Sequence, residues 1–149
     1  MASAQNPAKL TNEVAQTMYV HNIADATVAT KIAWVDMRGY EKILVAVTLV
    51  SGTGLLTVKL FTSGSSTGAD TPVVIRSHTD PTVADAAGDT VYLECTAEEL
   101  PALASATCVH PRYVSVEVDC DHADDIVAIS YIRTGGASFS GMTADQIAA

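Results

Sequence analysis

The chain has 149 residues, a length that favours one folded domain with a single hydrophobic core. Its eight basic and 17 acidic residues give a formal net charge of −9, which argues against binding to nucleic acid phosphates or to an anionic membrane. Hydrophobic residues make up 48% of the chain but aromatic residues only 5%, so aliphatic side chains dominate. The frequent valines and threonines favour β-structure.

Residues 1–16 are polar and alanine-rich, carry Pro7 and show no alternation of apolar and polar positions. Two interpretations stay open: a flexible tail, or an arm that becomes ordered against a neighbouring subunit. The segment lacks the hydrophobic stretch of a secretory signal. The longest uninterrupted apolar run, residues 43–47, is far too short to cross a membrane.

The strand pattern starts weakly at Thr17 and becomes clear over residues 27–35. Trp34, the only tryptophan, alternates there with Ile32 on one side and is expected in or beside the core. The next strand, residues 41–50, is apolar on both sides, with one set of Ile43, Val45, Val47 and Leu49 and another of Leu44, Ala46 and Val50. Such a strand must be covered on both sides, by a second sheet and by a chain arm or a partner protein.

A glycine-containing connection at 51–54 predicts a tight hairpin into a returning strand at 56–61, followed by an exposed Gly/Ser-rich loop at 62–70. A further strand begins just after Pro72, and residues 78–89 form the longest irregular stretch. Residues 90–96 are predicted to be a strand with Val91, Leu93 and Cys95 on one side. Thr96 and Glu99 match a capping box, so a short helical turn is expected from Ala97 to about Ala104, which Pro101 keeps from growing longer.

Residues 112–119 alternate cleanly, and residues 125–134 form a last strand that is again apolar on both sides. The chain thus contains about eight strands at spacings of about ten residues, with one short helical turn. This pattern predicts an all-β fold, an antiparallel β-sandwich or jelly roll, and argues against a parallel α/β fold. The expected organisation is an N-terminal arm at 1–16, a β-sandwich domain at 17–135 and a C-terminal tail at 136–149.

The acidic segment 119–125 is the strongest candidate for a metal-binding site. Its sequence is Asp119-Cys120-Asp121-His122-Ala123-Asp124-Asp125. Four carboxylates and an imidazole could hold Ca²⁺ or a transition metal. The spacing departs from the EF-hand loop, because Ala123 and Asp124 occupy the positions that need an oxygen ligand and a glycine. A charged, solvated hairpin turn between two strands explains the same residues. We therefore assign no metal site and no cofactor.

Three cysteines, Cys95, Cys108 and Cys120, form no CxxC pair, which fits synthesis in a reducing compartment and buried thiols, although a single bridge among them stays open. Cys108 with His110 invites a nucleophile–base interpretation, but alternate residues on an extended segment do not make a catalytic geometry. The histidines are scattered over four segments, as His21, His78, His110 and His122. No GxSxG, phosphate-binding or dinucleotide-binding motif occurs. We expect no enzyme and no catalytic residue.

Three stretches resemble small β-sandwich virion proteins of tailed bacteriophages: VDMRGYEKILVAVTLVSGTG at 35–54, LTVKLFTSG at 56–64 and PRYVSVEVD at 111–119. In that group an Asp–x–x–Gly–Tyr–Glu turn leads into a central strand, and a YVR-like strand lies near the end of the domain. The resemblance covers about residues 17–135. The chain departs from it where Ser115 replaces a common Arg, and where SGSSTG replaces a frequent Asp-Gly.

The resemblance implies a capsid decoration (cement) protein that clamps neighbouring capsomers, often as a trimer, or else a head–tail neck or tail component. The implied partners are the major capsid protein and further copies in a homotrimer, without nucleic acid or membrane. The implied location is the capsid surface of the virion, after synthesis in the host bacterial cytoplasm. The surplus apolar residues of strands 41–50 and 125–134 fit a subunit interface as well as cover by the chain's own arms. A carbohydrate-binding β-sandwich module is an alternative that would need exposed aromatic side chains.

Overall fold

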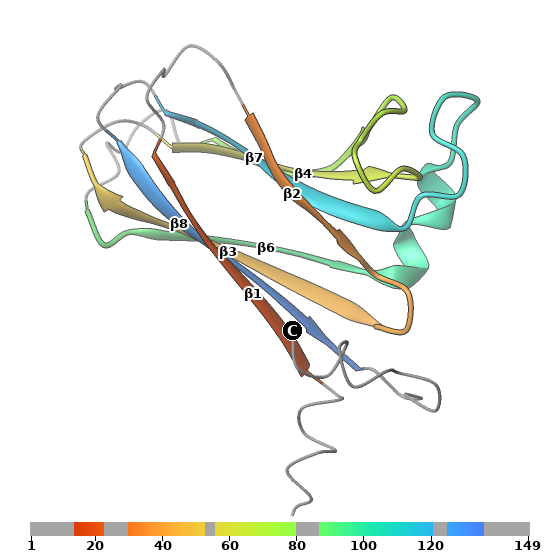
Figure 1. Ribbon diagram of the computed structural model, residues 1–149, viewed down its shortest axis with the longest axis horizontal. Helices are drawn as coiled ribbons and strands as arrows, with labels where there is room; N and C mark the ends of the chain where they lie inside the picture. The colour runs from red at the N-terminus through yellow and green to blue at the C-terminus, as the bar shows by residue number, and fades with distance from the viewer. Residues whose placement is uncertain (1–13, 23–29, 53–55, 80–86, 121–124, 136–149) are drawn as a thin grey trace, which may run out of the picture.

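The computed structural model describes residues 14–22, 30–52, 56–79, 87–120 and 125–135. These segments form two four-stranded antiparallel sheets that pack face to face (Figure 1). Two short 3-10 turns, η1 (Ala97–Glu99) and η2 (Pro101–Leu103), join the sixth strand to the seventh. The strands are β1 (Val14–Asn22), β2 (Thr30–Asp36), β3 (Lys42–Ser51), β4 (Leu56–Ser63), β5 (Val73–Thr79), β6 (Thr90–Thr96), β7 (Tyr113–Cys120) and β8 (Ile126–Thr134).

The strand order identifies the sandwich as a jelly roll. The first sheet has the order β1-β8-β3-β6 and the second the order β2-β7-β4-β5. The pairs β1–β8, β2–β7, β3–β6 and β4–β5 are nested, as in one long hairpin that has been wound into two sheets. The prediction of an all-β sandwich or jelly roll with about eight strands is confirmed.

Apart from β4 and β5, consecutive strands of this fold lie in different sheets, which corrects two local predictions. β3 pairs with β6 and β8, whereas β4 pairs with β5 and β7. Residues 51–54 therefore do not close a hairpin, and the connection between β7 and β8 is not a hairpin turn either. The glycine and aspartate signals mark the chain reversals correctly, but they do not say which strand lies beside which.

The core lies between the two sheets and follows the alternation of the strands. The predicted inner set of β3 is confirmed, because Ile43, Val45, Val47 and Leu49 are all buried. The second sheet meets them with the buried residues Val58, Leu60, Val114, Val116 and Val118. Each such side chain stabilises the fold by about 1.5–3 kcal/mol relative to an exposed position.

A β-bulge interrupts the alternation of β2. Ile32 lies opposite Val116 and Val35 lies opposite Val114, so Ala33 and Trp34 share a single place in the ladder. Ala33 has a φ of 49°, in the left-handed region. Ile32 and Val35 both face the core as a result.

Trp34 does not lie where the sequence pattern predicts it. The bulge turns its indole ring away from the core, where it is only half-buried and packs against Gly68 in the β4–β5 connection. The prediction of a tryptophan in or beside the core is therefore wrong. The extra residue in β2 is the physical reason, since it shifts the side-chain alternation by one position.

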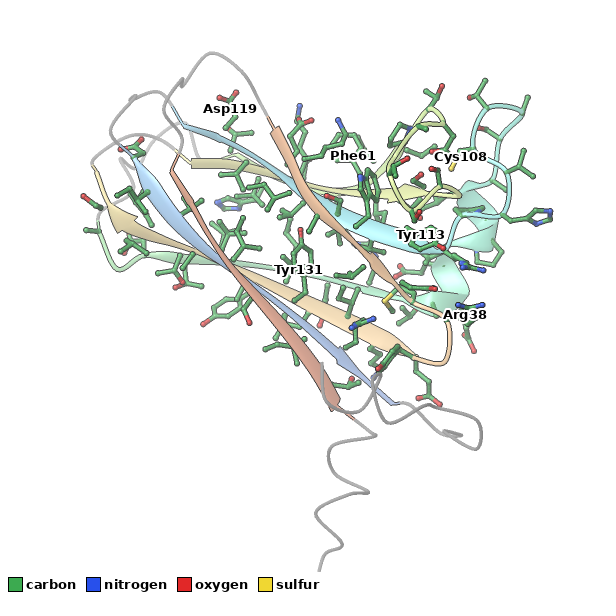
Figure 2. The ribbon with its side chains drawn as sticks, viewed as in Figure 1. Arg38, Phe61, Cys108, Tyr113, Asp119 and Tyr131 are labelled. Atoms are coloured by element: carbon green, nitrogen blue, oxygen red, sulfur yellow. The ribbon has the colours of Figure 1, made fainter. Side chains whose placement is uncertain are left out.

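Tyr131 of β8 crosses the core to the bulge. Its phenol group donates a hydrogen bond to the carbonyl oxygen of Ile32 and accepts one from the Val116 amide at 3.0 Å (Figure 2). The hydroxyl of Ser115 donates to the same Ile32 oxygen at 3.1 Å. The backbone groups that the bulge removes from the β2–β7 ladder are thus satisfied by Tyr131 from the opposite sheet and by Ser115 of β7.

The remaining predictions concern the ends of elements. β1 begins at Val14, earlier than the pattern at Thr17 suggests. The capping box is confirmed by the Thr96 amide, which donates to Glu99 Oε2 at 2.8 Å, and the expected helical turn is split into η1 and η2. Residues 1–13 of the predicted arm and the tail at 136–149 lie outside the described residues. Among the described residues, no helix has the length and hydropathy of a membrane span.

Candidate interaction surface

The turn between β2 and β3 contains the motif on which the resemblance rests, and its residues have clear structural roles. Asp36 Oδ1 accepts a hydrogen bond from the Arg38 amide at 2.9 Å, an Asx-type turn. The Tyr40 amide donates to the Met37 carbonyl at 3.0 Å, which closes the turn. Gly39 has a φ of 85°, which only glycine adopts without strain. Asp36 and Gly39 are therefore required by the turn itself.

Two arginines fix this turn to the sandwich, Arg112 just before β7 and Arg133 of β8. The Arg112 guanidinium donates to Asp36 Oδ2 at 3.2 Å and to the hydroxyl of the adjacent Tyr113. Arg133 donates to the Asp36 carbonyl oxygen at 2.7 Å and stacks over Tyr40, with 4.6 Å from its guanidinium carbon to the ring centre. The Arg112 contact thus joins the turn to the PRYV stretch.

The outer face of the second sheet is polar and carries charges that are largely paired. Lys31 of β2 donates to Glu117 of β7 at 2.8 Å, and its amine lies 4.3 Å from the centre of the Phe61 ring. Lys59 of β4 lies opposite the same Glu117 in the β4–β7 ladder. The long lysine side chain covers the aromatic ring while its amine stays at the surface. This face has the composition of a solvent-facing sheet.

The outer face of the first sheet is different, because it is apolar. Its outward residues on β3, β8 and β6 are Leu44, Ala46, Thr48, Ile126, Ala128, Ser130, Ile132 and Tyr92, which we call the apolar face. Tyr92 forms its rim, with 65% of its surface exposed, and lies in one row with Ala46 and Ser130. Glu94 lies in one row with Leu44 and Ile132, at the β6 edge of the face, and Lys42 lies in the next row, between Thr96 and Thr134.

The apolar face corresponds to the surplus of apolar residues that the sequence shows at 41–50 and 125–134. The inner sets of both strands meet the second sheet, whereas the outer sets remain half-exposed within the described part of the chain. The hydroxyls of Thr48 and Thr90 lie 2.8 Å apart, so these polar atoms satisfy each other at the edge of the face. A contiguous apolar sheet face of this kind is typical of a protein–protein contact.

The acidic segment 119–125 contains one buried carboxylate. Asp125 is 0% exposed, and among the described residues neither of its carboxylate oxygens has a hydrogen-bond partner. Its Oδ1 atom lies so close to Gly52 that a Cβ atom there would be 1.7 Å away. The interpretation of this residue as part of a solvated turn is wrong, because Asp125 is buried against Gly52. Residues 121–124 lie outside the described residues.

The described residues do not form a metal centre or a nucleophile–base pair. Within them, no group of three or more His, Cys, Asp or Glu side chains is close enough to hold a metal ion. Cys108 is fully buried and donates to the Thr62 carbonyl oxygen, whereas His110 is exposed, with a φ of 54°. His78 is half-buried in β5, and the side chain of His21 and residue 122 lie outside what the structure describes.

Asp70 lies close to Cys108 in the folded chain, and the sequence pattern does not reveal this contact. Burial raises the pKa of the Cys108 thiol, and the Asp70 charge adds to this effect. For Asp70, burial favours the neutral acid, but hydrogen bonds from the Ser63 hydroxyl and the Gly64 amide lower the pKa below its usual value. Asp70 thus closes the 62–70 loop, in which Thr62 and Ser63 are buried rather than exposed.

A shallow pocket of about 300 Å³ lies beside the edge of β6 and is lined by Lys42, Arg76, Glu94, Cys95, Thr96 and Glu99. The Thr96 amide and then the Arg76 guanidinium lower the pKa of Glu99, which keeps this carboxylate charged. Burial, followed by the Glu99 charge, raises the pKa of the Cys95 thiol to about 12. A protonated thiol beside the Arg76–Glu99 ion pair is a poor nucleophile.

We predict that the two described cysteines resist alkylation in the folded protein. Cys95 and Cys108 are both free and buried, and burial raises the pKa of each thiol, which favours the unreactive protonated form. Treatment with N-ethylmaleimide at pH 8, followed by peptide mass spectrometry, is expected to leave both unmodified. The same treatment in urea serves as the control and should modify both. Rapid labelling of Cys95 in the native state would contradict this picture of the pocket.

Comparisons with known proteins give little further information. No family model matches the chain, and no curated protein matches it. Among solved structures, it is similar to one described in the words "Bacillus endospore appendages form a novel family of disulfide-linked pili". That likeness has 15% sequence identity, covers 82% of this chain and 88% of the other, and has a TM-score of 0.39. At this level it establishes neither a shared fold nor a shared function.

Proposed function

We propose that the protein is a structural component of a tailed-phage virion, namely a capsid decoration protein that binds the outside of the head shell and clamps neighbouring capsomers. The observation that carries this proposal is the apolar face on the first sheet. A jelly roll already encloses its core between its sheets, so a second apolar face on the outside of one sheet favours contact with another protein. The Asp36–Glu41 turn and the PRYV stretch, which resemble phage virion proteins, support the same assignment.

The proposed action is mechanical. Each copy buries its apolar face against a shell subunit and joins sister copies in a closed ring, for which we propose three members. Contacts of the usual size, about 800 Å² per partner, would then act together, so that the ring dissociates far more slowly than one copy. The net charge of −9 supports a role outside the shell, because it prevents non-specific adhesion to the packaged nucleic acid.

The test compares shell binding by two variants that each add one glutamate. Ala46→Glu places a carboxylate in the middle of the apolar face, whereas Ser77→Glu places it on exposed β5 in the other sheet. Burial of an unpaired charge is expected to weaken binding at least about tenfold for Ala46→Glu, and Ser77→Glu should bind like the wild type. Co-sedimentation with shells that lack the protein measures this, with circular dichroism as a check on folding.

The particle itself provides the second readout. Shells with bound protein are expected to withstand heating and chaotropes better than bare shells. Equal resistance with and without the protein would overturn the clamp, and equal shell binding by Ala46→Glu and the wild type would overturn the assignment of the apolar face. Immunogold labelling distinguishes a decoration protein from a neck or tail component. The label would cover the head in the first case and would gather at one vertex in the second.

A further inference from the structure

The edge strand β6 of the first sheet carries a row of backbone groups that no other strand of the described chain covers. β6 pairs with β3 in unbroken register from Thr90 to Thr96, and in the described part of the chain β3 is its only partner strand. The free side of an edge strand presents N–H and C=O groups that can pair with another chain. The side of β6 that faces away from β3 therefore offers a place for a further strand.

The hydrogen bonds at the two ends of β6 show which of its backbone groups face outward. At one end, the Leu49 amide of β3 donates to the Asp89 carbonyl at 3.0 Å. At the other end, the Ala97 amide donates to the Glu41 carbonyl of the chain entering β3 at 2.8 Å. Because bonded residues alternate along an antiparallel ladder, the odd-numbered residues of β6 bond to β3. The even-numbered residues direct their N–H and C=O groups to the free side, namely Thr90, Tyr92 and Glu94.

Both edges of the second sheet are interrupted, whereas β6 is not. β2 contains the bulge at residues 33–34. The β4–β5 ladder shifts register at Ile75, whose carbonyl accepts a hydrogen bond from the Arg76 side chain at 3.0 Å. Bulges, lysines and prolines are the usual protection of an edge, and β6 contains none of them, with Glu94 as its one charged residue. β1 is regular as well, but its side chains lie outside the described residues.

Tyr92 lies in the middle of the free stretch of β6 and at the rim of the apolar face. Its side chain is 65% exposed and lies in one row with Ala46 and Ser130. Two antiparallel edge strands related by a two-fold axis present the same face of their sheets on the same side. A second copy added at β6 would therefore extend the sheet and place the two apolar faces side by side, on the side that the proposed function assigns to the shell.

We infer that β6 pairs with β6 of a second copy, antiparallel and about a two-fold axis at Tyr92. In this register Tyr92 lies opposite the second copy's Tyr92, and Thr90 lies opposite the second copy's Glu94. The two tyrosines add an aromatic cross-strand pair to the backbone hydrogen bonds between the copies. The two Glu94 side chains are separated by about 13 Å along the strands, since each residue advances the chain by about 3.3 Å.

The neighbouring registers are less favourable. A two-fold axis at Glu94 places two carboxylates directly opposite each other, which is destabilising. An axis at Leu93 brings the same carboxylates to diagonal positions and needs the Thr96 amide as a donor. That amide already donates to Glu99 Oε2 at 2.8 Å. The free stretch therefore ends before Thr96, and the axis at Tyr92 uses all of its outward groups.

The contact is isologous, so it closes after two copies and leaves the other surfaces of each copy free. Each member of the proposed ring of three would then hold one member of a neighbouring ring, which links the rings over the shell. This link rests on the proposed function. The pairing of two copies at β6 can be tested on the isolated protein.

A disulfide trap tests the register. Bonded residues that face each other in an antiparallel pair have Cα atoms about 5.5 Å apart, a separation that a disulfide spans. Under mild oxidation, Tyr92→Cys is expected to form a two-chain band on a non-reducing gel at least about tenfold faster than Glu94→Cys, because only the residue on the axis faces its own copy. Wild-type protein, which has three cysteines of its own, receives the same oxidation as a control.

Tyr92→Pro tests the contribution of the backbone. The Tyr92 amide faces away from β3, so proline removes a donor from the free edge and none from the β3 ladder. Sedimentation velocity is expected to show that the pairing of two copies is at least about tenfold weaker than in the wild type. Tyr92→Ala, which shortens the same side chain but keeps the amide, is the matched control and should pair more tightly than Tyr92→Pro. Circular dichroism checks the folding of both variants.

A trapped Tyr92→Cys pair together with weakened pairing of Tyr92→Pro supports the inference. Absence of the trapped pair overturns the two-fold contact at Tyr92, even where the protein associates through another edge such as β1. Equal association of Tyr92→Pro with the wild type, or with Tyr92→Ala, overturns the role of the β6 backbone. A trapped pair in a protein that does not bind shells would contradict only the proposed function, so the two failures are distinguishable.

Discussion

Replacement of Tyr131 by phenylalanine is expected to lower the free energy of unfolding by about 1–3 kcal/mol, although it removes a single oxygen atom. That oxygen accepts the Val116 amide at 3.0 Å and donates to the Ile32 carbonyl at the centre of the molecule. In the variant, the Ile32 oxygen keeps the Ser115 hydroxyl, but the Val116 amide is left in an apolar core without an acceptor. The buried Val116 amide without an acceptor accounts for most of the expected loss of unfolding free energy.

Urea denaturation followed by circular dichroism measures this change. Tyr92→Phe is the matched control, because it removes the same atom from a side chain that is 65% exposed, and it should change the free energy by less than about 0.5 kcal/mol. Ser115→Ala combined with Tyr131→Phe should cost more than the sum of the two, since both hydroxyls serve the Ile32 oxygen. Equal stability of Tyr131→Phe and wild type would show that the bulge does not depend on Tyr131.

The alternation of side chains predicts the strands well where the ladder is regular. Val114, Val116 and Val118 of β7 and the inner set of β3 lie where the sequence places them. The β2 bulge has no such signal, because its left-handed residue is Ala33 rather than a glycine or asparagine. The ring of Trp34 points away from the core for this reason alone. A bulge held by Tyr131, about a hundred residues away, cannot be recognised from local pattern.

The candidate surface is predictable in part. The apolar residues on both sides of β3 and β8 are visible in the sequence, and they form the apolar face. By contrast, the burial of Asp125 depends on its approach to Gly52, and the state of Cys108 depends on Asp70. These contacts join segments that are distant in sequence. The alternation of apolar residues indicates which side chains a strand buries, but it does not indicate which distant segment packs against them.

The contact between Gly68 and Trp34 leads to the second large effect. Gly68 has a φ of 67°, and a Cβ atom there would lie 2.6 Å from Cζ2 of the Trp34 ring. Gly68→Ala therefore adds a steric clash to the backbone strain of a left-handed alanine, and is expected to cost about 2–4 kcal/mol. Gly39→Ala separates the two causes, because Gly39 has a φ of 85° but no atom of the described residues within 4 Å of its would-be Cβ. Strain alone should cost about 1 kcal/mol there.

The cause of the difference can be assigned by removing the ring. In a Trp34→Leu background, Gly68→Ala should cost about as much as Gly39→Ala, since a smaller side chain leaves room for the added methyl group. Chemical denaturation followed by far-ultraviolet circular dichroism reports all four variants, because fluorescence is lost with the only tryptophan. If Gly68→Ala and Gly39→Ala cost the same with Trp34 in place, the indole ring does not pack on Gly68. The outward orientation of Trp34 would then depend on the bulge in β2 and not on a contact with Gly68.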